Sequence, residues 1–257
     1  MSRSGAQEVV TPDGPPDITP DGSPDITPDG SPVAVYRALP AEPGFTPLLE
    51  VLRPPARVLD LGCGAGRLAN LLAAHGFAVT GVDASPAMLV GLAREVRTVL
   101  ARIEEVRLRE RFDVVVLASQ LVNEPDVRRR RALLATAQAH VADDGAVFLE
   151  HLDPDLLAGP PERTATVGSV DVRFRVLAVR GQEIDGEVRY GLDGRTWTQR
   201  FTSLLLDDEA LERDLAAVGL VSRRRLSPTW LQAGAASSGP ATPPEPNAGT
   251  DPRSHPS

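Results

Sequence analysis

The sequence feature that most constrains the fold is the segment VLDLGCGAGRLA at residues 58–69. An apolar run of strand character leads directly into glycines at positions 62, 64 and 66, and a helical pattern follows at once. Glycines at such a turn allow a tight bend and let a ligand approach the backbone without a Cβ in the way. In an open parallel sheet the first strand-to-helix turn is the usual ligand site. The segment therefore predicts an α/β protein with a ligand loop at residues 62–66.

Strands and helices alternate around this loop. Apolar β-type runs occupy residues 56–62, 77–83, 97–103, 111–119 and 145–152, and helical patterns occupy 66–76, 86–96 and 126–141. Strands that alternate with helices of this length indicate parallel βαβ units. Only about eight residues separate the third strand from the fourth, which is short for a parallel crossover. A single helical turn in EEVRLRE is expected to make that connection.

The pattern changes after the fifth strand. Residues 165–206 contain three long segments of partly alternating apolar and polar residues, joined by the hairpin signals RGQ and DG. They predict an inserted antiparallel β meander. A helix at 207–220 and strands at 221–227 and 229–234 complete the pattern. The expected fold is a Rossmann-like, seven-stranded, mostly parallel sheet with an antiparallel closing hairpin, plus the meander.

Both ends of the chain are predicted to lie outside this fold. The sequence DITPDGSP occurs at residues 17–24 and again at 25–32, after a degenerate copy, TPDGPP. Polar, proline-rich repeats cannot bury enough apolar surface to offset their ordering entropy. We therefore expect residues 1–32 and 235–257 to be disordered tails. Residues 33–234 are expected to form one domain, with residues 165–206 as its β insertion.

Charge and composition limit the classes of partner. The net charge of −8 is concentrated in the tails, and the expected domain is nearly neutral, which gives no electrostatic reason to expect nucleic acid. The basic run at residues 128–131 is interpreted as a solvated helix face. The single cysteine, Cys63, excludes a disulfide framework and a cysteine-based metal site. No run has the apolar length of a signal peptide or membrane span, so we expect a cytoplasmic monomer or homodimer that does not bind membranes.

The glycine loop departs from the dinucleotide-binding fingerprint, because Arg67 stands where GxGxxG needs its last glycine. An acidic residue followed by GxGxG resembles the first motif of the class I S-adenosylmethionine (SAM)-dependent methyltransferases of small-molecule type. The segments VTGVDAS and FDVVVLASQLVN and the closing hairpin resemble further elements of that family, in the same order. The resemblance covers residues 33 to about 234, and it implies a methyltransferase that uses SAM as its cofactor.

The resemblance also implies roles for single residues. Asp60 would lie near the methionine amino group, and Asp83, at the end of the second strand, would hold the ribose hydroxyls. Ala84 and Met88 would pack near the adenine, and Ser119 would lie beside the methionine end. The backbone of the loop would line the methionine and ribose at Gly62, Cys63, Gly64 and Gly66.

One position departs from the family pattern. Many members place an acidic residue at the end of the third strand to bond the adenine amino group, and Arg102 occupies or adjoins that place here. The adenine amino group would then be bound by the backbone of Ile103 or by the side chain of Glu104. Cys63 is interpreted as a small residue tolerated in a crowded turn, although its place in the loop also invites a nucleophilic role.

Candidate residues for the acceptor side lie in three other segments. His151 follows the fifth strand at the carboxyl edge of the sheet, where ligands gather. Tyr36 and Glu42 lie in residues 33–52, a segment that often covers the pocket in the family, and Asn123 follows the fourth strand. The candidate catalytic residues are His151, Tyr36 and Asn123. The alternative for each is a structural role, in which its polar atoms bond within the protein.

The predicted function is in-line transfer of a methyl group to a nitrogen or oxygen of a small molecule, without a metal. Alignment of the reactants can supply roughly 7–11 kcal/mol in the best intramolecular cases, and a base matters only if the acceptor atom is protonated. A non-catalytic SAM-binding or interaction protein remains an alternative, because this chemistry needs no diagnostic side chain. A nicotinamide-dependent oxidoreductase would share the sheet and Asp83, but the glycine spacing opposes it. A nucleic-acid methyltransferase would need a basic surface or a motif such as NPPY, and the sequence has neither.

Overall fold

The computed structural model describes residues 26–27 and 30–236, so most of both predicted tails lies outside the described residues. The main sheet contains β1 (Arg57–Leu61), β2 (Ala78–Asp83), β3 (Arg97–Leu100), β4 (Phe112–Leu117), β5 (Val141–Glu150), β10 (Leu220–Ser227) and β11 (Trp230–Ala235). Its order is β10-β11-β5-β4-β1-β2-β3. Strands β1 to β5 pair in parallel, and β11 runs antiparallel to both of its neighbours. The predicted parallel sheet with an antiparallel closing hairpin is confirmed.

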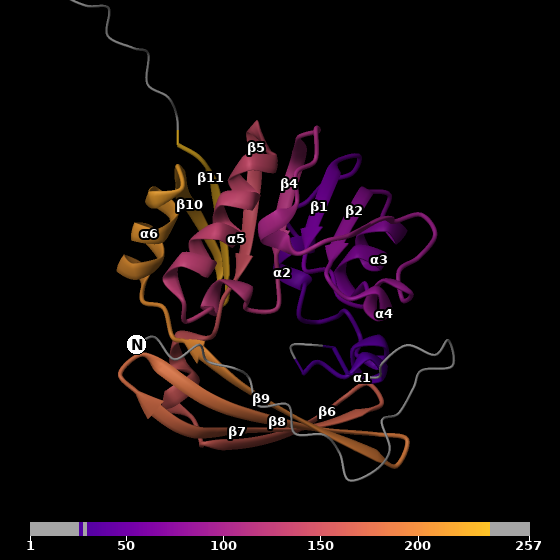
Figure 1. Ribbon diagram of the computed structural model, residues 1–257, viewed down its shortest axis with the longest axis vertical. Helices are drawn as coiled ribbons and strands as arrows, with labels where there is room; N and C mark the ends of the chain where they lie inside the picture. Colours follow the sequence, from indigo (N-terminus) through magenta and orange to yellow (C-terminus); the bar gives the residue numbers. More distant parts are fainter. Residues whose placement is uncertain (1–25, 28–29, 237–257) are drawn as a thin grey trace, which may run out of the picture.

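Helices cover both faces of this sheet (Figure 1). Helices α2 (Thr46–Leu49) and α3 (Arg67–Ala74) pack on one face, and α5 (Val127–His140) and α6 (Asp208–Ala217) pack on the other. Val58 and Val116 are buried on the α3 side, whereas Leu59 and Val115 are buried on the α5 side. Burial on both faces explains why the central strands are continuous apolar runs.

The short crossover between β3 and β4 is a single turn, as predicted. It is the 3-10 helix η1 (Ile103–Glu105). The following loop is fixed by His140, whose Nε2 accepts a hydrogen bond from the backbone N–H of Leu108 at 2.9 Å. The ring of His140 is buried, so its role is to hold this connection.

The helix predicted at residues 86–96 is much shorter than expected. Helix α4 covers only Pro86–Leu89, and Ser85 caps its N-terminus, because the N–H of Met88 donates to Oγ of Ser85. Beyond it, the side chain of Asn70 on α3 donates to the carbonyl of Gly91 at 3.0 Å and accepts from the N–H of Ala93 at 2.8 Å. These contacts take backbone groups that a continuing helix would use, so tertiary hydrogen bonds end the helix.

The insertion is a separate four-stranded antiparallel sheet rather than the three strands expected. It consists of β6 (Glu162–Val167), β7 (Val170–Arg180), β8 (Glu183–Leu192) and β9 (Arg195–Leu204), in that order. The extra hairpin lies inside the first predicted segment, where Gly168 adopts a φ of +63° and Val167 pairs with Val170. A two-residue turn of this kind leaves little interruption in the alternating pattern, so the sequence did not separate β6 from β7.

The second sheet lies beneath the carboxyl edge of the main sheet, and α1 (Val33–Ala38) lies between them (Figure 1). Val35 of α1 packs into a cluster with Val170, Tyr190 and Trp197 on the inward face of the second sheet. The sequence pattern places alternate residues of each strand on this face. The insertion is therefore positioned next to the predicted ligand loop rather than at the far end of the molecule.

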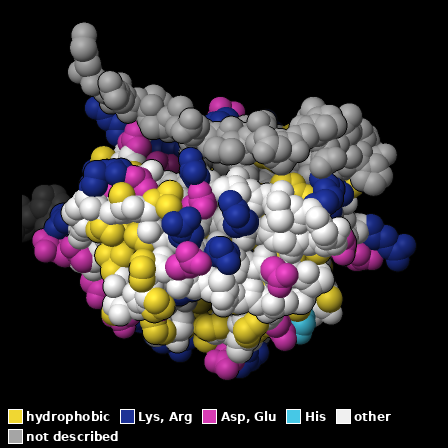
Figure 2. Space-filling model, turned by 90° about the horizontal axis from the view of Figure 1, so that it is seen from below, with side chains coloured by type: hydrophobic (Ala, Val, Ile, Leu, Met, Phe, Trp, Pro, Cys, Tyr) yellow, Lys and Arg dark blue, Asp and Glu magenta, His cyan; other side chains and the backbone are white. Residues whose placement is uncertain are grey.

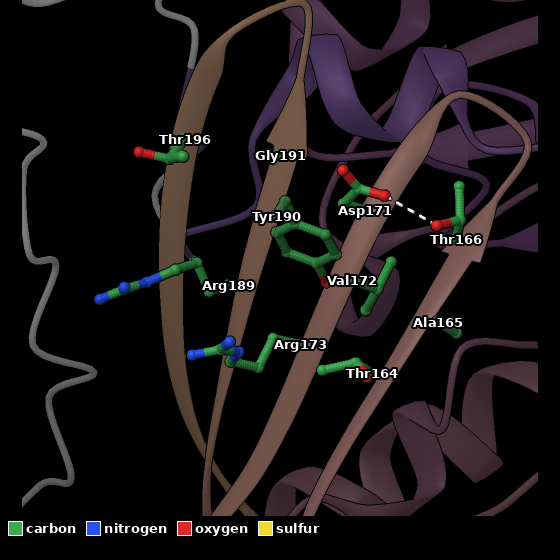
Figure 3. Close-up of a pocket in the computed structure, with 10 residues that line it drawn as sticks. All are labelled: Thr164, Ala165, Thr166, Asp171, Val172, Arg173, Arg189, Tyr190, Gly191 and Thr196. Atoms are coloured by element: carbon green, nitrogen blue, oxygen red, sulfur yellow. Dashed lines mark hydrogen bonds between the residues drawn. The ribbon is translucent and has the colours of Figure 1, made fainter.

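The outward face of the second sheet carries charges of both signs (Figure 2). Glu187 pairs with Arg200 at 3.0 Å, and Glu162 pairs with Arg175 at 3.2 Å. An open groove of about 620 Å³ lies on the four strands of this sheet, with Arg173 and Arg189 in its lining (Figure 3). These two arginines are directly opposite each other in the register of β7 and β8.

Residues 26–27 and 30–32, which belong to the second copy of the N-terminal repeat, lie within the described part of the chain. Oγ1 of Thr27 accepts from the N–H of Ser31 at 3.0 Å, and the N–H of Gly30 donates to the carbonyl of Thr27 at 2.9 Å. Ile26 packs against the cluster around Trp197, and Gln199 of β9 donates to Oγ of Ser31 at 3.3 Å. Ile26 and Ser31 therefore contact the second sheet.

The basic run at residues 128–131 is only in part the solvated face that was expected. Arg130 is 4% exposed, and its Nε lies 2.6 Å from Oδ2 of Asp214 on α6. Arg131 binds the other oxygen of the same carboxylate at 2.7 Å. Arg130 and Arg131 therefore link α5 to α6 through the carboxylate of Asp214. The sequence could not show this ion pair, because it depends on how α5 packs against α6.

Candidate active site

The loop between β1 and α3 has the conformation that its glycines allow. Gly62, Gly64 and Gly66 have φ values of +77°, +53° and +89°, which residues with a Cβ rarely adopt. The N–H groups of Gly62 and Cys63 donate to the carbonyl of Val82 at 2.8 and 2.9 Å, which ties the loop to the end of β2. A Cβ on Gly64 would meet no atom within 4 Å. The backbone is therefore open on that side of the loop, as a ligand would require.

Asp83 is fixed at the end of β2 beside this loop. Its Oδ2 accepts from the N–H of Gly64 at 2.9 Å, and its Oδ1 accepts from the N–H of Ser85 at 2.8 Å. Each carboxylate oxygen can accept more than one hydrogen bond. The side chain is thus held in place while keeping acceptor capacity for a ligand's hydroxyl groups.

Asp60, in β1, has an unsatisfied carboxylate. The side chain is 2% exposed, and its Oδ2 has no hydrogen-bond partner among the residues that the structure describes. Burial, and then the negative charge of Asp83, raises the pKa of Asp60 to about 7. Buried polar atoms without a partner are rare, and each one calls for an explanation. A cationic group on a ligand would satisfy this oxygen and stabilise its charge.

The other residues assigned to the cofactor lie around this pair of carboxylates. The Cδ1 of Ile103 lies 3.3 Å from where a Cβ of Gly62 would be, so Ile103 borders the loop. Ala84 is exposed next to Asp83, whereas Met88 is buried against Val33 of α1. Ser119 lies two residues after the end of β4 and has a φ of +55°.

Glu104, the alternative for the adenine contact, is held by arginines. Its Oε1 lies 3.2 Å from Nε of Arg129 and 3.5 Å from Nη2 of Arg102. These ion pairs compete with a role in binding a neutral amino group. The carbonyl of Ile103 already accepts from the hydroxyl of Thr136 at 3.0 Å, so its contact with the adenine stays a prediction.

Cys63 has the environment of a structural residue. Its side chain is 7% exposed, and Sγ lies 2.9 Å from where a Cβ of Gly81 would be. Burial, with the charges of Asp60 and Asp83 in second and third place, raises the pKa of the Cys63 thiol. The thiolate is the nucleophilic form of cysteine, so this environment opposes a nucleophilic role.

The structure brings a further carboxylate, Glu150, to the same edge. Glu150 is the last residue of β5, and its Oε2 accepts from the backbone N–H of Ser119 at 2.6 Å. Burial raises the pKa of Glu150, while the Ser119 N–H and the positive charge of Arg67 act in the opposite sense. The sequence interpretation chose the neighbouring His151 and missed Glu150. The available signal was a carboxylate at the last position of a parallel strand.

Two tyrosines from separate segments meet beside Arg67. The hydroxyls of Tyr36 on α1 and Tyr190 on β8 share a hydrogen bond, and both tyrosines lie close enough to Arg67 to interact with its charge. Burial, and then Tyr36, raises the pKa of Tyr190. Tyr36 was predicted for the acceptor side, whereas Tyr190 could be placed there only by the packing of the second sheet.

Arg67 also fixes the N-terminal segment over the edge. Its Nε and Nη2 donate to the carbonyl of Pro40 at 3.1 and 2.9 Å, and its guanidinium lies 5.4 Å from the centre of the Phe45 ring. Trp230 holds the same segment from β11, because its Nε1 donates to the carbonyl of Gly44 at 3.2 Å. Residues 33–52 therefore cover the site through specific contacts with α3 and β11.

His151 is engaged on both ring nitrogens. Nδ1 lies 2.9 Å from the carbonyl of Leu152, and Nε2 lies 2.8 Å from Nη1 of Arg225. Because the guanidinium can only donate, Nε2 is the acceptor and Nδ1 carries the proton. Burial is the main cause that lowers the pKa of His151. These contacts give His151 a structural role, and they oppose the catalytic role predicted from its position.

Asn123 is likewise used within the protein. It is 1% exposed; its Nδ2 donates to the carbonyl of Leu204 at 2.7 Å, and its Oδ1 accepts from the N–H of Leu152 at 2.9 Å. Leu152 precedes the second sheet and Leu204 ends it. One amide therefore ties together the two chain segments that enter and leave the insertion, which favours a structural role over contact with the acceptor.

Within residues 26–27 and 30–236, no three His, Cys, Asp or Glu side chains converge as they would around a metal ion. In the same ranges, each helix is too short or too polar to cross a membrane.

Comparison with known proteins identifies the family to which the sequence is similar. A family model described as a methyltransferase domain matches residues 36–221. A ubiquinone biosynthesis O-methyltransferase from Pseudomonas syringae pv. tomato is 35% identical over 106 residues, which cover 38% of this chain and 44% of that protein. A second one, from Pseudomonas aeruginosa, is 30% identical over 106 residues with the same coverage. The match thus spans less than half of these curated relatives.

Solved structures are similar over a larger share of the chain. The CcbJ methyltransferase from Streptomyces caelestis superposes with a TM-score of 0.61 at 19% identity, covering 76% of this chain and 91% of that one. A sugar N-methyltransferase from a Streptoalloteichus species gives a TM-score of 0.57 at 20% identity, covering 78% of this chain and 88% of that one. At such identities the similarity concerns the fold.

Proposed function

This chain belongs to the S-adenosylmethionine-dependent methyltransferase family, and from this premise we propose that it transfers a methyl group to a nitrogen or oxygen of a small molecule. The family model covers most of the chain, from residue 36 to residue 221. The similar proteins include both O-methyltransferases and a sugar N-methyltransferase, so the proposal includes oxygen and nitrogen as acceptor atoms.

The observation that carries the proposal is the unpaired Oδ2 of Asp60 beside an open glycine loop. The amino group of the methionine part of SAM is a cation that fits this oxygen. The two oxygens of Asp83, fixed by backbone N–H groups, suit the two hydroxyls of a ribose. The residues present therefore fit the cofactor, which supplies an activated methyl group when bound.

The residues of this chain have to align the acceptor atom with that methyl group and keep water away. Tyr36 approaches from α1, Tyr190 from the second sheet and Glu150 from β5, while Arg67 holds the covering segment. Holding both reactants in line converts a bimolecular step into one within a complex, which can supply several kcal/mol. We infer that residues 33–52 and the second sheet form the walls of the acceptor site and choose the acceptor.

Calorimetric titration with SAM, its demethylated product and NAD tests the proposal. We expect binding of the first two and no response to NAD. Replacement of Asp83 by Ala removes acceptors for two hydroxyls, each worth roughly 1.5–3 kcal/mol before compensation by water, so the dissociation constant for SAM should rise at least about tenfold. An unchanged constant in a folded Asp83→Ala variant would refute the ribose role.

Transfer itself is tested with methyl-labelled SAM and a panel of small phenols, alcohols and amines. Incorporation of label into an acceptor identifies the enzyme's reaction. Tight SAM binding with no incorporation across the panel would instead favour the alternative of a non-catalytic SAM-binding protein.

A further inference from the structure

Apart from Asp60, whose unpaired oxygen is buried, Glu150 is the carboxylate at the carboxyl edge that has an oxygen without a hydrogen bond to a described residue. Its Oε2 accepts from the N–H of Ser119, and its Oε1 has no hydrogen bond to any residue that the structure describes. Unlike Oδ2 of Asp60, this oxygen is not among the buried atoms that lack a partner, so it is accessible. The carboxylate is therefore held by one oxygen and available through the other.

The neighbouring groups are already used. Both ring nitrogens of His151 have partners, and Tyr190 shares a hydrogen bond with Tyr36. Asp60 and Asp83 are the carboxylates assigned to the cofactor. Arg67 donates to Pro40 and acts on Glu150 only through its charge. Apart from the two carboxylates assigned to the cofactor, Asp60 and Asp83, Glu150 is the group described at this edge that can take a proton from a bound acceptor.

The contact with Ser119 also fixes where this carboxylate lies. Ser119 and Gln120 have φ values of +55° and +57°, a left-handed conformation that is uncommon for residues with a Cβ. Such conformations persist where surrounding contacts hold them, and they cluster at functional sites. Glu150 supplies one of these contacts, so the strand end and the loop after β4 position each other.

We propose that Glu150 is the general base of the reaction and that the acceptor class is a molecule whose reacting oxygen or nitrogen carries a dissociable proton. The inference rests on the proposed methyl transfer. The acceptor atom forms a bond to the methyl carbon with its lone pair while the bond from that carbon to the sulfonium sulfur breaks. The electron pair of the broken bond stays on sulfur, and the proton of the acceptor passes to Oε1 of Glu150. The base lies at the end of β5, close enough to Arg67 to interact with its charge.

The matched test compares Glu150→Gln with Glu150→Ala. Gln keeps an oxygen that can accept from the N–H of Ser119, but it cannot take a proton, whereas Ala loses both functions. We expect Glu150→Gln to lower the single-turnover rate by about 10²–10⁴-fold while the dissociation constant for SAM stays within about twofold. Glu110→Gln, which changes an exposed carboxylate paired with Arg57, is the control and should leave the rate unchanged.

The pH profile and the acceptor separate the possible outcomes. With the native enzyme the rate should rise with pH as the Glu150 carboxyl ionises, and this limb should be absent in Glu150→Gln. For an alcohol the loss should persist at every pH, whereas for a phenol or an amine it should shrink at high pH, where the acceptor atom has already lost its proton in solution. A Glu150→Gln enzyme within about threefold of the native rate, with the same pH profile, would overturn the proposal.

A second measurement does not depend on turnover. In protein carrying ¹³C-carboxyl-labelled glutamate, the NMR signal that is lost in Glu150→Gln should titrate at a pKa above the ordinary 4.5, because burial disfavours the charged form. Titration at or below the ordinary value would contradict the role of Glu150 as a base. If the native protein transfers no methyl group to any acceptor, the proposed function fails, and this titration still decides whether Glu150 has the environment of a base.

Discussion

At the scale of single residues, the most informative side chain is Asp60, because its buried and unpaired oxygen makes both cofactor binding and folding depend on pH. A carboxyl whose pKa is raised to about 7 binds its proton more tightly in the folded chain than in the unfolded chain. The stabilisation that this proton gives is complete below the unfolded pKa near 3.8 and is lost as the pH rises through about 7. A bound cation reverses this preference, since it favours the ionised form.

We predict that the affinity for SAM rises with pH between pH 5 and 7, by up to about tenfold per pH unit. The physical reason is that the ammonium of the cofactor binds the ionised form of Asp60, so that binding at pH 6 should release a proton. Calorimetry in two buffers of different ionisation enthalpy measures both the affinity and the released proton.

Asp60→Asn is the matched variant for this prediction. It should bind SAM more weakly at pH 7, release no proton on binding and, without the cofactor, unfold at a higher temperature than the native protein at pH 8. A native affinity that is independent of pH over this range would show that Asp60 is not the partner of the cofactor's amino group.

At the scale of helices and strands, the buried ion pair between Arg130 on α5 and Asp214 on α6 should contribute to the free energy of unfolding. Removing one partner of a buried ion pair leaves an uncompensated charge and typically costs about 3–5 kcal/mol. Asp214→Ala leaves the buried Arg130 without its partner, so it should lower the free energy of unfolding more than Arg130→Met does. Asp214 accepts from Arg130 and from Arg131, whose side chain is 45% exposed. Urea denaturation gives the free energy of unfolding of each variant.

The control for this ion pair lies in the same run of arginines. Arg131→Ala removes the exposed member only, and surface pairs contribute about 0–1 kcal/mol. If Asp214→Ala costs no more than Arg131→Ala, the buried pair does not stabilise the contact between the two helices.

The turn in the N-terminal repeat allows an internal comparison at the same scale. Thr27 is 7% exposed, and its hydroxyl accepts from the N–H of Ser31 and donates to the carbonyl of the same residue at 3.1 Å. Losing these hydrogen bonds should cost about 1–2 kcal/mol, which for a domain of this size lowers the Tm by roughly 2–8 °C. Calorimetric melting of Thr27→Ala measures the change.

Thr19 holds the identical place in the first copy of the repeat, eight residues earlier. Thr19→Ala should leave the Tm unchanged if the second copy alone occupies the docking position beside Gln199. Equal losses from the two substitutions would mean that both copies contribute to folding, and no loss from either would mean that the turn adds nothing to stability.

At the scale of the whole molecule, the second sheet can be treated as a separable part. Asn123 bonds to both Leu152 and Leu204, so the chain ends of the insertion lie within the reach of one side chain. We predict that a short linker in place of residues 153–203 abolishes turnover while cofactor affinity is largely kept, because Tyr190 and the wall on α1 are lost but Asp60 and Asp83 are not.

Circular dichroism and calorimetry with SAM decide whether such a variant retains the folded cofactor half, and the labelled-methyl assay then reports on transfer. Full activity without the second sheet would mean that it does not form the acceptor site. Its outward face, with the open groove of Figure 3, would then become the better place to look for its role.

Much of the fold and of the cofactor side could be predicted from the sequence because both depend on local patterns. A run such as VLDLGCGAGRLA fixes a buried strand, a turn that only glycines allow and the start of a helix, and the topology of parallel strands then places Asp60 and Asp83 at one edge. The split of β6 from β7 and the early end of α4 were not predicted, since a two-residue turn and the hydrogen bonds of Asn70 leave little trace in periodicity.

Only the tertiary structure decided which polar side chains remain available. By position along the strands, His151 and Asn123 are as good candidates as Glu150, but Arg225, Leu152 and Leu204 use up their hydrogen-bonding atoms. Tyr190 reaches Tyr36 only because the second sheet folds back beneath the first. A side chain's place at a strand end follows from the local sequence, whereas its freedom to bind a ligand depends on which distant donors and acceptors the packed chain brings within about 3 Å of it.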